Sequence, residues 1–285
     1  MIQNAIGTAP ITLFEKDNHV VISLPGVPNE MKNVMTNQII PLLRQKFHTE
    51  AIIHKTLLVQ GYSESGLAMK IADWENSLPD NIHLAYLPIP GITKLRLSGK
   101  SNNHTELELS INQYISSLEK ILGNAIISYE DTPLEKIVGN ILRQKEKTLA
   151  TAESCTGGYI AHRITSIPGS SEYFKGTIVA YSNTIKTTIL QVAETDLVNC
   201  GAVSKEVVEQ MAKNVQNLLQ SDYAIATSGV AGPDGGTENK PVGTIWISVC
   251  SATNMLTRKY NFSNDRIYNI VRTTQTALLM LKEIL

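Results

Sequence analysis

The chain has 285 residues and a formal net charge of −1, from 25 Lys and Arg against 26 Asp and Glu. Hydrophobic residues make up 42% of it, which excludes a largely disordered protein and, at about 150 residues per domain, indicates roughly two domains. The balanced charge gives no basic footprint for nucleic acid, and no apolar run approaches the ~18 residues that a membrane span needs.

No charged and then apolar leader opens the sequence, so we expect a soluble, cytoplasmic protein that binds neither membrane nor nucleic acid. Its cysteines, Cys155, Cys200 and Cys250, are odd in number and widely spaced. That spacing argues against a disulfide framework and against a zinc cluster.

Residues 1–48 predict a strand, a turn and a helix. An apolar run at 19–26 ends in a Pro-Gly turn, and a helical pattern opens at Asn29 and continues to Leu42. A segment of about 50 residues is too small to bury a core alone. We therefore expect it to be the tail of an α/β domain whose front half is absent.

Residues 49–130 predict a small α+β unit. Strands are expected at 56–62, 83–89 and 93–99, and helices at 65–75 and 111–122. The polar residues here show no catalytic spacing. A packing or dimerisation module is the expectation for this unit.

Residues 131–285 alternate strands with helices, which predicts a layered α/β domain. Thr132, Pro133 and Glu135 predict a capping box with Pro at the first helical position. Ser204 is expected to cap another helix. The expected strands are 148–153, 176–182, 222–229 and 244–250, and the expected helices start near 133, 154, 184, 204 and 265.

Three polar or glycine-rich turns follow strands of this third block, at 151–158, 180–186 and 227–236. Sites in open α/β sheets form beyond the carboxyl ends of the strands, so we expect the turns to converge. Ser154 lies where a strand gives way to a helix, and the unpaired N–H groups there can stabilise an oxyanion. The alternative is that Ser154 is only a helix cap.

A serine nucleophile needs a base, and Lys186 is the better candidate. His162 follows Ser154 by eight residues on the expected helix, roughly 12 Å along its axis, which is too far for a hydrogen bond. Asn183 is expected to cap a short helix with Lys186 at its third position, where the helix dipole would lower the lysine pKa. The alternative is an exposed surface lysine.

Arg266 is expected in the first turn of the last helix, where a cation is unfavourable unless it faces an anion such as a phosphate. Arg272 is a second, less well placed candidate, and a weak surface pair between Arg266 and Asp265 is the alternative. The loop Gly229–Gly236 can cradle a phosphate with its backbone N–H groups. Glu153 and Asp234 could bind a metal, but no His or Cys spacing supports it.

The quoted motifs carry a specific resemblance. The run TAESCTGGYIAHRITSIPGSSEYFKGTIVAYSNTIK (151–186) closely resembles the C-terminal domain of the CinA family, competence/damage-inducible protein A. Residues 200–204, 227–247 and 264–278 do so as well. Residues 49–130 resemble the KH-like middle domain of that family, and 7–10 with 24–31 resemble the end of its molybdopterin-binding-like domain.

The resemblance implies a three-layer α/β/α C-terminal domain with nicotinamide mononucleotide (NMN) deamidase activity. It would release nicotinate mononucleotide and ammonia, without a cofactor or metal, in a homodimer. It carries the nucleophile onto Ser154 and the base onto Lys186, with Tyr181 as a helper. The substrate and its oxyanion are expected at Cys155, Thr156, Gly157, Gly229, Ala231, Gly232, Gly235 and Arg266.

Two other functions stay open at the level of the sequence. Because most of the molybdopterin-binding-like domain is missing, the metal-dependent ADP-ribose pyrophosphatase activity associated with it is not expected here. A non-catalytic adaptor linked to competence or DNA damage is the other alternative. Cys155, as a thiolate without a histidine partner, ranks below Ser154 as the nucleophile.

Overall fold

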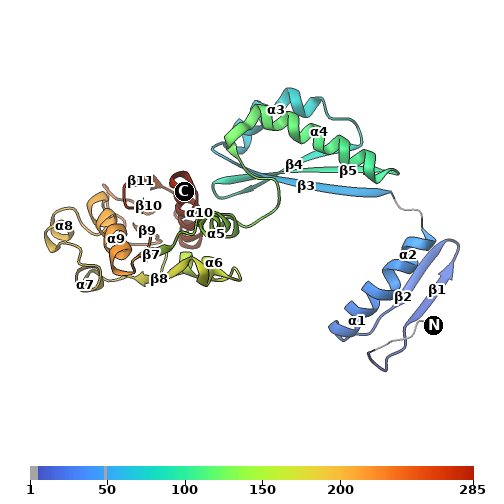
Figure 1. Cartoon of the computed structure of the whole chain (residues 1–285), viewed down its shortest axis with the longest axis horizontal. Coiled ribbons are helices and arrows are strands. Elements are labelled where there is room, and N and C mark those ends of the chain that lie inside the picture. The colour runs from blue at the N-terminus through green and yellow to red at the C-terminus, as the bar shows by residue number, and fades with distance from the viewer. Residues whose placement is uncertain (1–5, 48–49) are drawn as a thin grey trace.

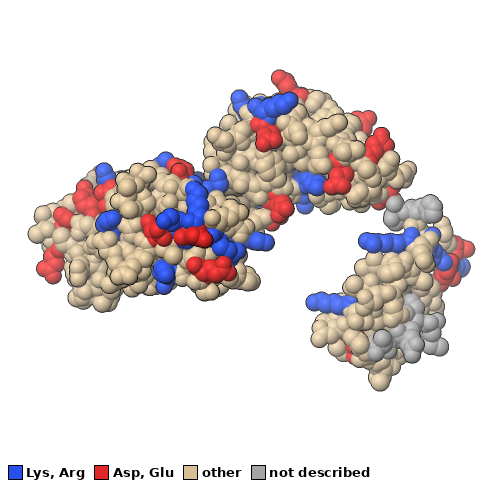
Figure 2. Space-filling view, viewed as in Figure 1, with Lys and Arg blue, Asp and Glu red and all other residues tan. Residues whose placement is uncertain are grey.

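The computed structural model describes residues 6–47 and 50–285, which form three units in chain order (Figure 1). In the described part of the chain, no helix is both long and apolar enough to cross a bilayer. Figure 2 shows acidic and basic side chains interspersed over the face in view.

The first unit is a hairpin with a bent helical segment. Strands β1 (Thr12–Lys16) and β2 (His19–Ser23) pair antiparallel, and α1 (Pro28–Val34) continues through a π-helical turn (Met35–Ile39) into α2 (Ile40–Lys46). The predicted strand and helix are confirmed, whereas β1 was missed. The Asp17–Asn18 turn, in which both residues have positive φ, was its signal.

The second unit is an antiparallel sheet with helices against it, which confirms the predicted α+β character. Its strand order is β4-β5-β3-β6. Helix α4 begins earlier than predicted because the side chain of Asn103 caps it, accepting from Glu106 N at 3.2 Å. The elements are β3 (Ala51–Gln60), α3 (Glu64–Asn76), β4 (Ile82–Ile89), β5 (Ile92–Ser101), α4 (His104–Leu122) and β6 (Ile126–Ser128).

The third unit contains a five-stranded sheet of order β11-β10-β9-β7-β8, in which β8, β7 and β9 are parallel and β10 is antiparallel to both its neighbours. Its strands are β7 (Leu149–Glu153), β8 (Phe174–Val179), β9 (Tyr223–Gly229), β10 (Thr244–Cys250) and β11 (Met255–Asn261). Its helices are α5 (Leu134–Gln144), α6 (Tyr159–Thr165), α7 (Asn183–Thr188), α8 (Glu194–Asn199), α9 (Lys205–Leu218) and α10 (Arg266–Ile284).

Strand residues of this sheet alternate between two cores, which confirms the three-layer α/β/α architecture. Ile225 and Ile247 pack with α5, α6 and α10, while Ala224 and Ala226 pack with α9 on the opposite face (Figure 1). The small alanines let α9 approach the sheet closely. Ser204 caps α9 as predicted, accepting from Val207 N.

The predicted capping box at the start of α5 is wrong. The helix begins at Leu134, and its cap, Pro133, offers no side-chain acceptor. Glu135 is buried and pairs with Arg163 of α6 instead of turning back to the helix start. Burial against a neighbouring helix, which the local pattern does not reveal, redirects this carboxylate.

The second and third units share one continuous hydrophobic core. Leu58, Ile92 and Ile127 of the sheet in the second unit belong to the same buried cluster as Leu134 and Leu281 of the third. By contrast, the first unit has its own small cluster around Ile11, Val34 and Ile39.

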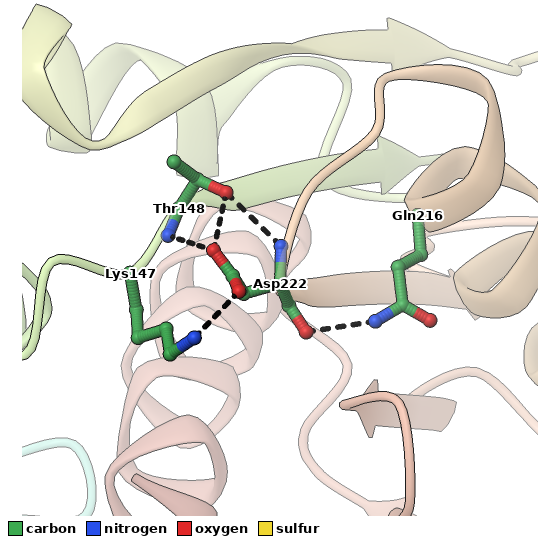
Figure 3. Close-up of polar contacts among 4 residues, drawn as sticks. All are labelled: Lys147, Thr148, Gln216 and Asp222. Carbon is green, nitrogen blue, oxygen red and sulfur yellow. Dashed lines mark hydrogen bonds and ion pairs between the residues drawn. The ribbon is translucent and has the colours of Figure 1, made fainter.

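At the amino-terminal ends of the central strands, Asp222 links β9 to β7 by hydrogen bonds (Figure 3). Its Oδ2 accepts from Thr148 N at 2.9 Å and from Thr148 Oγ1 at 2.8 Å, and its Oδ1 accepts from Lys147 Nζ at 2.9 Å. Gln216 of α9 donates to the backbone carbonyl of Asp222 at 2.8 Å. The carboxylate therefore fixes the start of the β7–β9 pair, Leu149 opposite Tyr223.

We expect Asp222→Ala to lower the free energy of unfolding by about 1–3 kcal/mol near neutral pH, because it leaves Thr148 N–H without its charged acceptor. Partial burial acts to raise the pKa of Asp222, but hydrogen bonds from Lys147 and Thr148 outweigh it and lower that pKa below 3.8. The stabilisation is thus present above the unfolded pKa and is lost as pH falls through the lower folded value.

Urea unfolding of the wild type and of Asp222→Ala, measured from pH 7 downward in steps for as long as both proteins stay folded, checks this. The difference between the two midpoints should shrink once the pH falls below the unfolded pKa of the carboxyl group. Lys147→Ala is the matched control, because it removes only an exposed ion pair and should lower the stability much less than Asp222→Ala does. A difference between wild type and Asp222→Ala that is the same at every pH would contradict the assignment.

Candidate active site

All the loops of the third unit that carry predicted site residues lie at one end of its strands. The carboxyl ends of β7, β8 and β9 meet there because these strands are parallel. Since β11 is antiparallel to β10, the chain returns to this end before α10. The topology therefore brings together the turn after Ser154, the segment 180–186, the loop after Gly229 and the start of α10.

Ser154 and Lys186 are in direct contact at this end. Lys186 Nζ lies 3.0 Å from Ser154 Oγ. The same amine donates to the carbonyl of Ala180 at 2.7 Å and to that of Tyr181 at 3.4 Å. Both side chains are buried, with 1% of Lys186 and 9% of Ser154 exposed.

The surroundings of Lys186 favour its neutral form. No carboxylate lies within ion-pair distance of it anywhere in the described ranges, and burial lowers the pKa of its amine below the ordinary 10.5. A neutral amine has two hydrogens and one lone pair. When the hydrogens go to the Ala180 and Tyr181 carbonyls, the lone pair is left to accept the proton of Ser154.

The predicted origin of this effect needs correction. Ser182, not Asn183, caps α7, since its Oγ accepts from Ile185 N at 3.3 Å. Asn183 is the first residue of the helix, so Lys186 is the fourth rather than the third. Burial, not position in a helix dipole, is the main cause of the lowered pKa of Lys186.

Glu153 organises the turn that follows β7. Its carboxylate is fully buried and accepts from the N–H groups of Gly158, Ile160 and Ala161 at 2.9–3.0 Å. It therefore occupies the amino end of α6, and Gly158, not Ser154, is the cap residue. Across residues 6–47 and 50–285 no group of three or more His, Cys, Asp or Glu is arranged for a metal.

The N–H groups of Cys155 and Thr156 have no oxygen acceptor among the described residues. They immediately follow Ser154 and are the backbone donors left for an oxyanion at this turn. The side chain of Thr156 points inward, with its Oγ1 2.9 Å from Thr227 Oγ1. Burial raises the pKa of the Cys155 thiol to about 12, which keeps it protonated at neutral pH.

A pocket of about 210 Å³ opens above the Ser154–Lys186 pair. Predicted residues lining it are Ser154, Cys155, Tyr181, Lys186, Gly229, Ala231 and Arg266. Residues that were not predicted to belong to the site also line it, namely Asn183, which was expected only as a helix cap, and Ala202, Val203 and Ser228. Thr156, Gly157, Gly232 and Gly235 do not line it, although each belongs to a neighbouring turn.

Arg266 is held across the pocket mouth by two acceptors. Its Nη1 donates to the carbonyl of Gly232 at 2.8 Å and its Nη2 to the hydroxyl of Tyr181 at 3.0 Å. The alternative pair with Asp265 does not form, because Asp265 caps α10 and accepts from Tyr268 N at 2.6 Å. The guanidinium charge has no carboxylate within 4 Å in the part of the chain that is described.

Asn269 is a structural residue that sequence reasoning missed. It is fully buried, donates to the carbonyls of Ala231 and Ser263 at 2.9 and 2.8 Å, and accepts from Ser263 N at 3.0 Å. It thereby ties the glycine-rich loop to the start of α10. An amide in the buried stripe of an otherwise amphipathic helix was the signal available.

Comparisons with known proteins agree with this architecture. The family sequence model of the CinA C-terminal domain matches residues 131–285, and the family model of the KH domain of damage-inducible protein CinA matches residues 54–128. A CinA-like protein of Cytophaga hutchinsonii is 44% identical over 281 residues, which are 99% of this chain and 67% of that protein. One of Flavobacterium psychrophilum is 44% identical over 284 residues, 99% of this chain and 68% of its own.

Solved structures match about half of the chain. The competence/damage inducible protein CihA of Agrobacterium tumefaciens is 33% identical with a TM-score of 0.52, covering 53% of this chain and 93% of its own. The competence damage-inducible protein A of Klebsiella pneumoniae is 32% identical with a TM-score of 0.51, at 53% and 93% coverage. With its motifs, its fold and its relatives in agreement, the chain belongs to the CinA family.

Proposed function

We propose that this chain is an amidohydrolase that converts NMN to nicotinate mononucleotide and ammonia, with Ser154 as nucleophile and Lys186 as base. The contact between a buried, carboxylate-free lysine and a serine at the floor of a pocket is the observation that carries the proposal. The substrate comes from the resemblance to the CinA C-terminal domain. The pocket itself supports an anionic ligand, because Arg266 lines it without a carboxylate neighbour among the described residues.

The first half of the reaction acylates the enzyme. Lys186 Nζ accepts the proton of Ser154 as Oγ attacks the carboxamide carbon, and the resulting oxyanion is placed near the N–H groups of Cys155 and Thr156. Lys186 then returns the proton to the departing nitrogen. The C–N bond breaks, ammonia leaves, and an ester links Ser154 to the nicotinoyl group.

The second half hydrolyses that ester. Water takes the place of ammonia, Lys186 accepts one of its protons, and the hydroxide attacks the ester carbonyl. The C–O bond to Ser154 breaks, Oγ regains the proton, and the pyridine carboxylate is released. Every proton transfer uses the same Nζ, which the Ala180 and Tyr181 carbonyls hold within reach of Oγ.

Arg266 is the proposed contact for the phosphate of the substrate. It lines the pocket, its charge has no carboxylate neighbour among the described residues, and Tyr181 and Gly232 hold it in place. Guanidinium groups recognise phosphate with paired, charge-assisted hydrogen bonds. The nearby backbone of Gly229 to Ala231 completes this wall of the pocket.

Ser154→Ala should reduce ammonia release from NMN by at least about 10³-fold, because no other nucleophile replaces Oγ. Cys155→Ala is the matched control, and it should keep substantial activity because its thiol stays protonated. Both proteins are checked for native circular dichroism, and the assay is run with and without a metal chelator. Full activity in Ser154→Ala, or activity that the chelator removes, would overturn the Ser/Lys mechanism.

The pH dependence of kcat/KM should report Lys186. The neutral amine is the active form, so activity should fall as pH drops through its lowered pKa and reach a plateau above it. Lys186→Arg stays protonated over the whole range and should be inactive throughout. A flat profile in the wild type over the whole pH range in which the protein stays folded, with ammonia release limited by chemistry, would count against a lysine base.

Arg266→Gln should raise the KM for NMN about tenfold or more through the loss of a phosphate contact. Nicotinamide riboside, which has the same carboxamide and ribose but no phosphate, provides the comparison. Its kcat/KM should change much less in the variant than that of NMN. Equal losses for both compounds would place Arg266 elsewhere in the reaction.

A further inference from the structure

Two further open pockets lie around Tyr268 and Arg272 of α10, and one of them also has walls from the second unit. One, of about 500 Å³, is lined by the turns that follow β3 and β4 and by α10, namely Tyr62, Ser63, Glu64, residues 88–93, Tyr268 and Arg272. Another of about 500 Å³ is lined by Asn261, Phe262, Ser263, Asp265, Tyr268 and Arg272. They share Tyr268 and Arg272, and neither shares a lining residue with the Ser154 pocket.

Arg272 is the charged centre of this junction. Its guanidinium lies 4.9 Å from the ring centroid of Phe262 and 5.8 Å from that of Tyr268, and its Nη1 donates to the Tyr268 hydroxyl at 2.6 Å. Within the described chain it has no carboxylate partner and no other hydrogen-bond acceptor. Its remaining N–H groups are thus free to bind a ligand in a planar, paired geometry.

Most of the carboxylates around Arg272 already accept hydrogen bonds from other residues. Asp265 caps α10, and both oxygens of Glu283, which lines a third adjoining cavity, accept from Arg258. Glu64, in the first turn of α3, has no ion-pair partner among the described residues and faces the same cavity as Arg272. The Ser63 Oγ accepts from Gly66 N at 3.1 Å and lies 3.4 Å from Ser65 Oγ, so it already has two hydrogen-bond partners at the start of α3.

The other walls are apolar or aromatic. Tyr62 and Tyr268 are 38% and 36% exposed, and Pro88, Ile89 and Pro90 form the side opposite α10. Ligand sites in proteins are typically cavities of ~300–1,000 Å³ at the junction of two units, mostly apolar with a few convergent polar groups. A guanidinium beside exposed aromatic rings suits a planar ring that carries an anionic group.

We propose that this Arg272 junction is a binding site for a small aromatic phosphate of the nucleoside monophosphate class, separate from the Ser154 pocket. The phosphate pairs with Arg272, and the base lies against Tyr62 and the Pro88–Pro90 turn. Because its walls come from both units, a bound ligand braces the second unit against α10. That helix begins with Arg266 of the other pocket.

Isothermal titration of the full chain with adenosine 5′-monophosphate tests the site. We expect saturable binding tighter than about 1 mM, with adenosine and inorganic phosphate each binding about tenfold more weakly. Arg272→Gln should weaken binding of the monophosphate about tenfold or more by loss of the paired contact. Glu64→Gln should strengthen it a few-fold, because it removes a negative charge that faces the same pocket and would repel the phosphate.

Arg266→Gln and Ser154→Ala are the matched controls, and both should bind the monophosphate as the wild type does. Thermal melts confirm that each variant is folded. Absence of saturable binding at several millimolar, an unchanged affinity in Arg272→Gln, or loss of binding in Arg266→Gln would each overturn the proposal. The last of these would show the monophosphate in the Ser154 pocket.

Discussion

The chemistry proposed for this protein depends on a lysine that is buried without a counter-charge. Burial of an ammonium group is costly, so Lys186 is favoured as a neutral amine. Two backbone carbonyls orient it, and the side chain left within reach of its lone pair is the hydroxyl of Ser154. A carboxylate close to Lys186 would reverse this by stabilising the charged form.

The rest of the third unit serves to hold that contact in place. Parallel pairing of β8, β7 and β9 delivers Lys186, Ser154 and the glycine-rich loop to one end of these strands. Glu153 fixes the turn after Ser154 through three backbone N–H groups, and Asn269 fixes the loop to α10. These two residues touch no substrate in the proposed mechanism, yet the positions of the backbone donors and of Arg266 rest on them.

The sequence predicted those helices and strands that are determined by residues close together in the chain. The Ser204 cap and the apolar strand Thr244–Cys250 needed no knowledge of tertiary structure. By contrast, β11 was missed because it is an edge strand with polar residues such as Arg258 and Lys259, which resemble a loop. The predicted capping box at Thr132 is wrong because Glu135 forms an ion pair with Arg163, which lies far from it in the sequence.

The same division holds for the site. Ser154 and Lys186 could be paired from the sequence because each follows a strand and parallel strands end together. The roles of Glu153 and Asn269 could not be predicted, because burial decides them and the sequence shows only their polarity. The pKa of Lys186 was expected to be lowered for one reason, helix position, and is lowered for another, burial.

The two ends of the parallel strands of this sheet differ in whether their residues line the pocket. At the amino ends, Asp222 and Thr148 lock the central strands with hydrogen bonds that involve no residue of the pocket. At the carboxyl ends of the same strands, turns follow whose side chains line the pocket of Ser154 and Lys186. Substitutions in the turns at the carboxyl end can therefore change the lining of the pocket without removing the hydrogen bonds that set the register of β7 and β9.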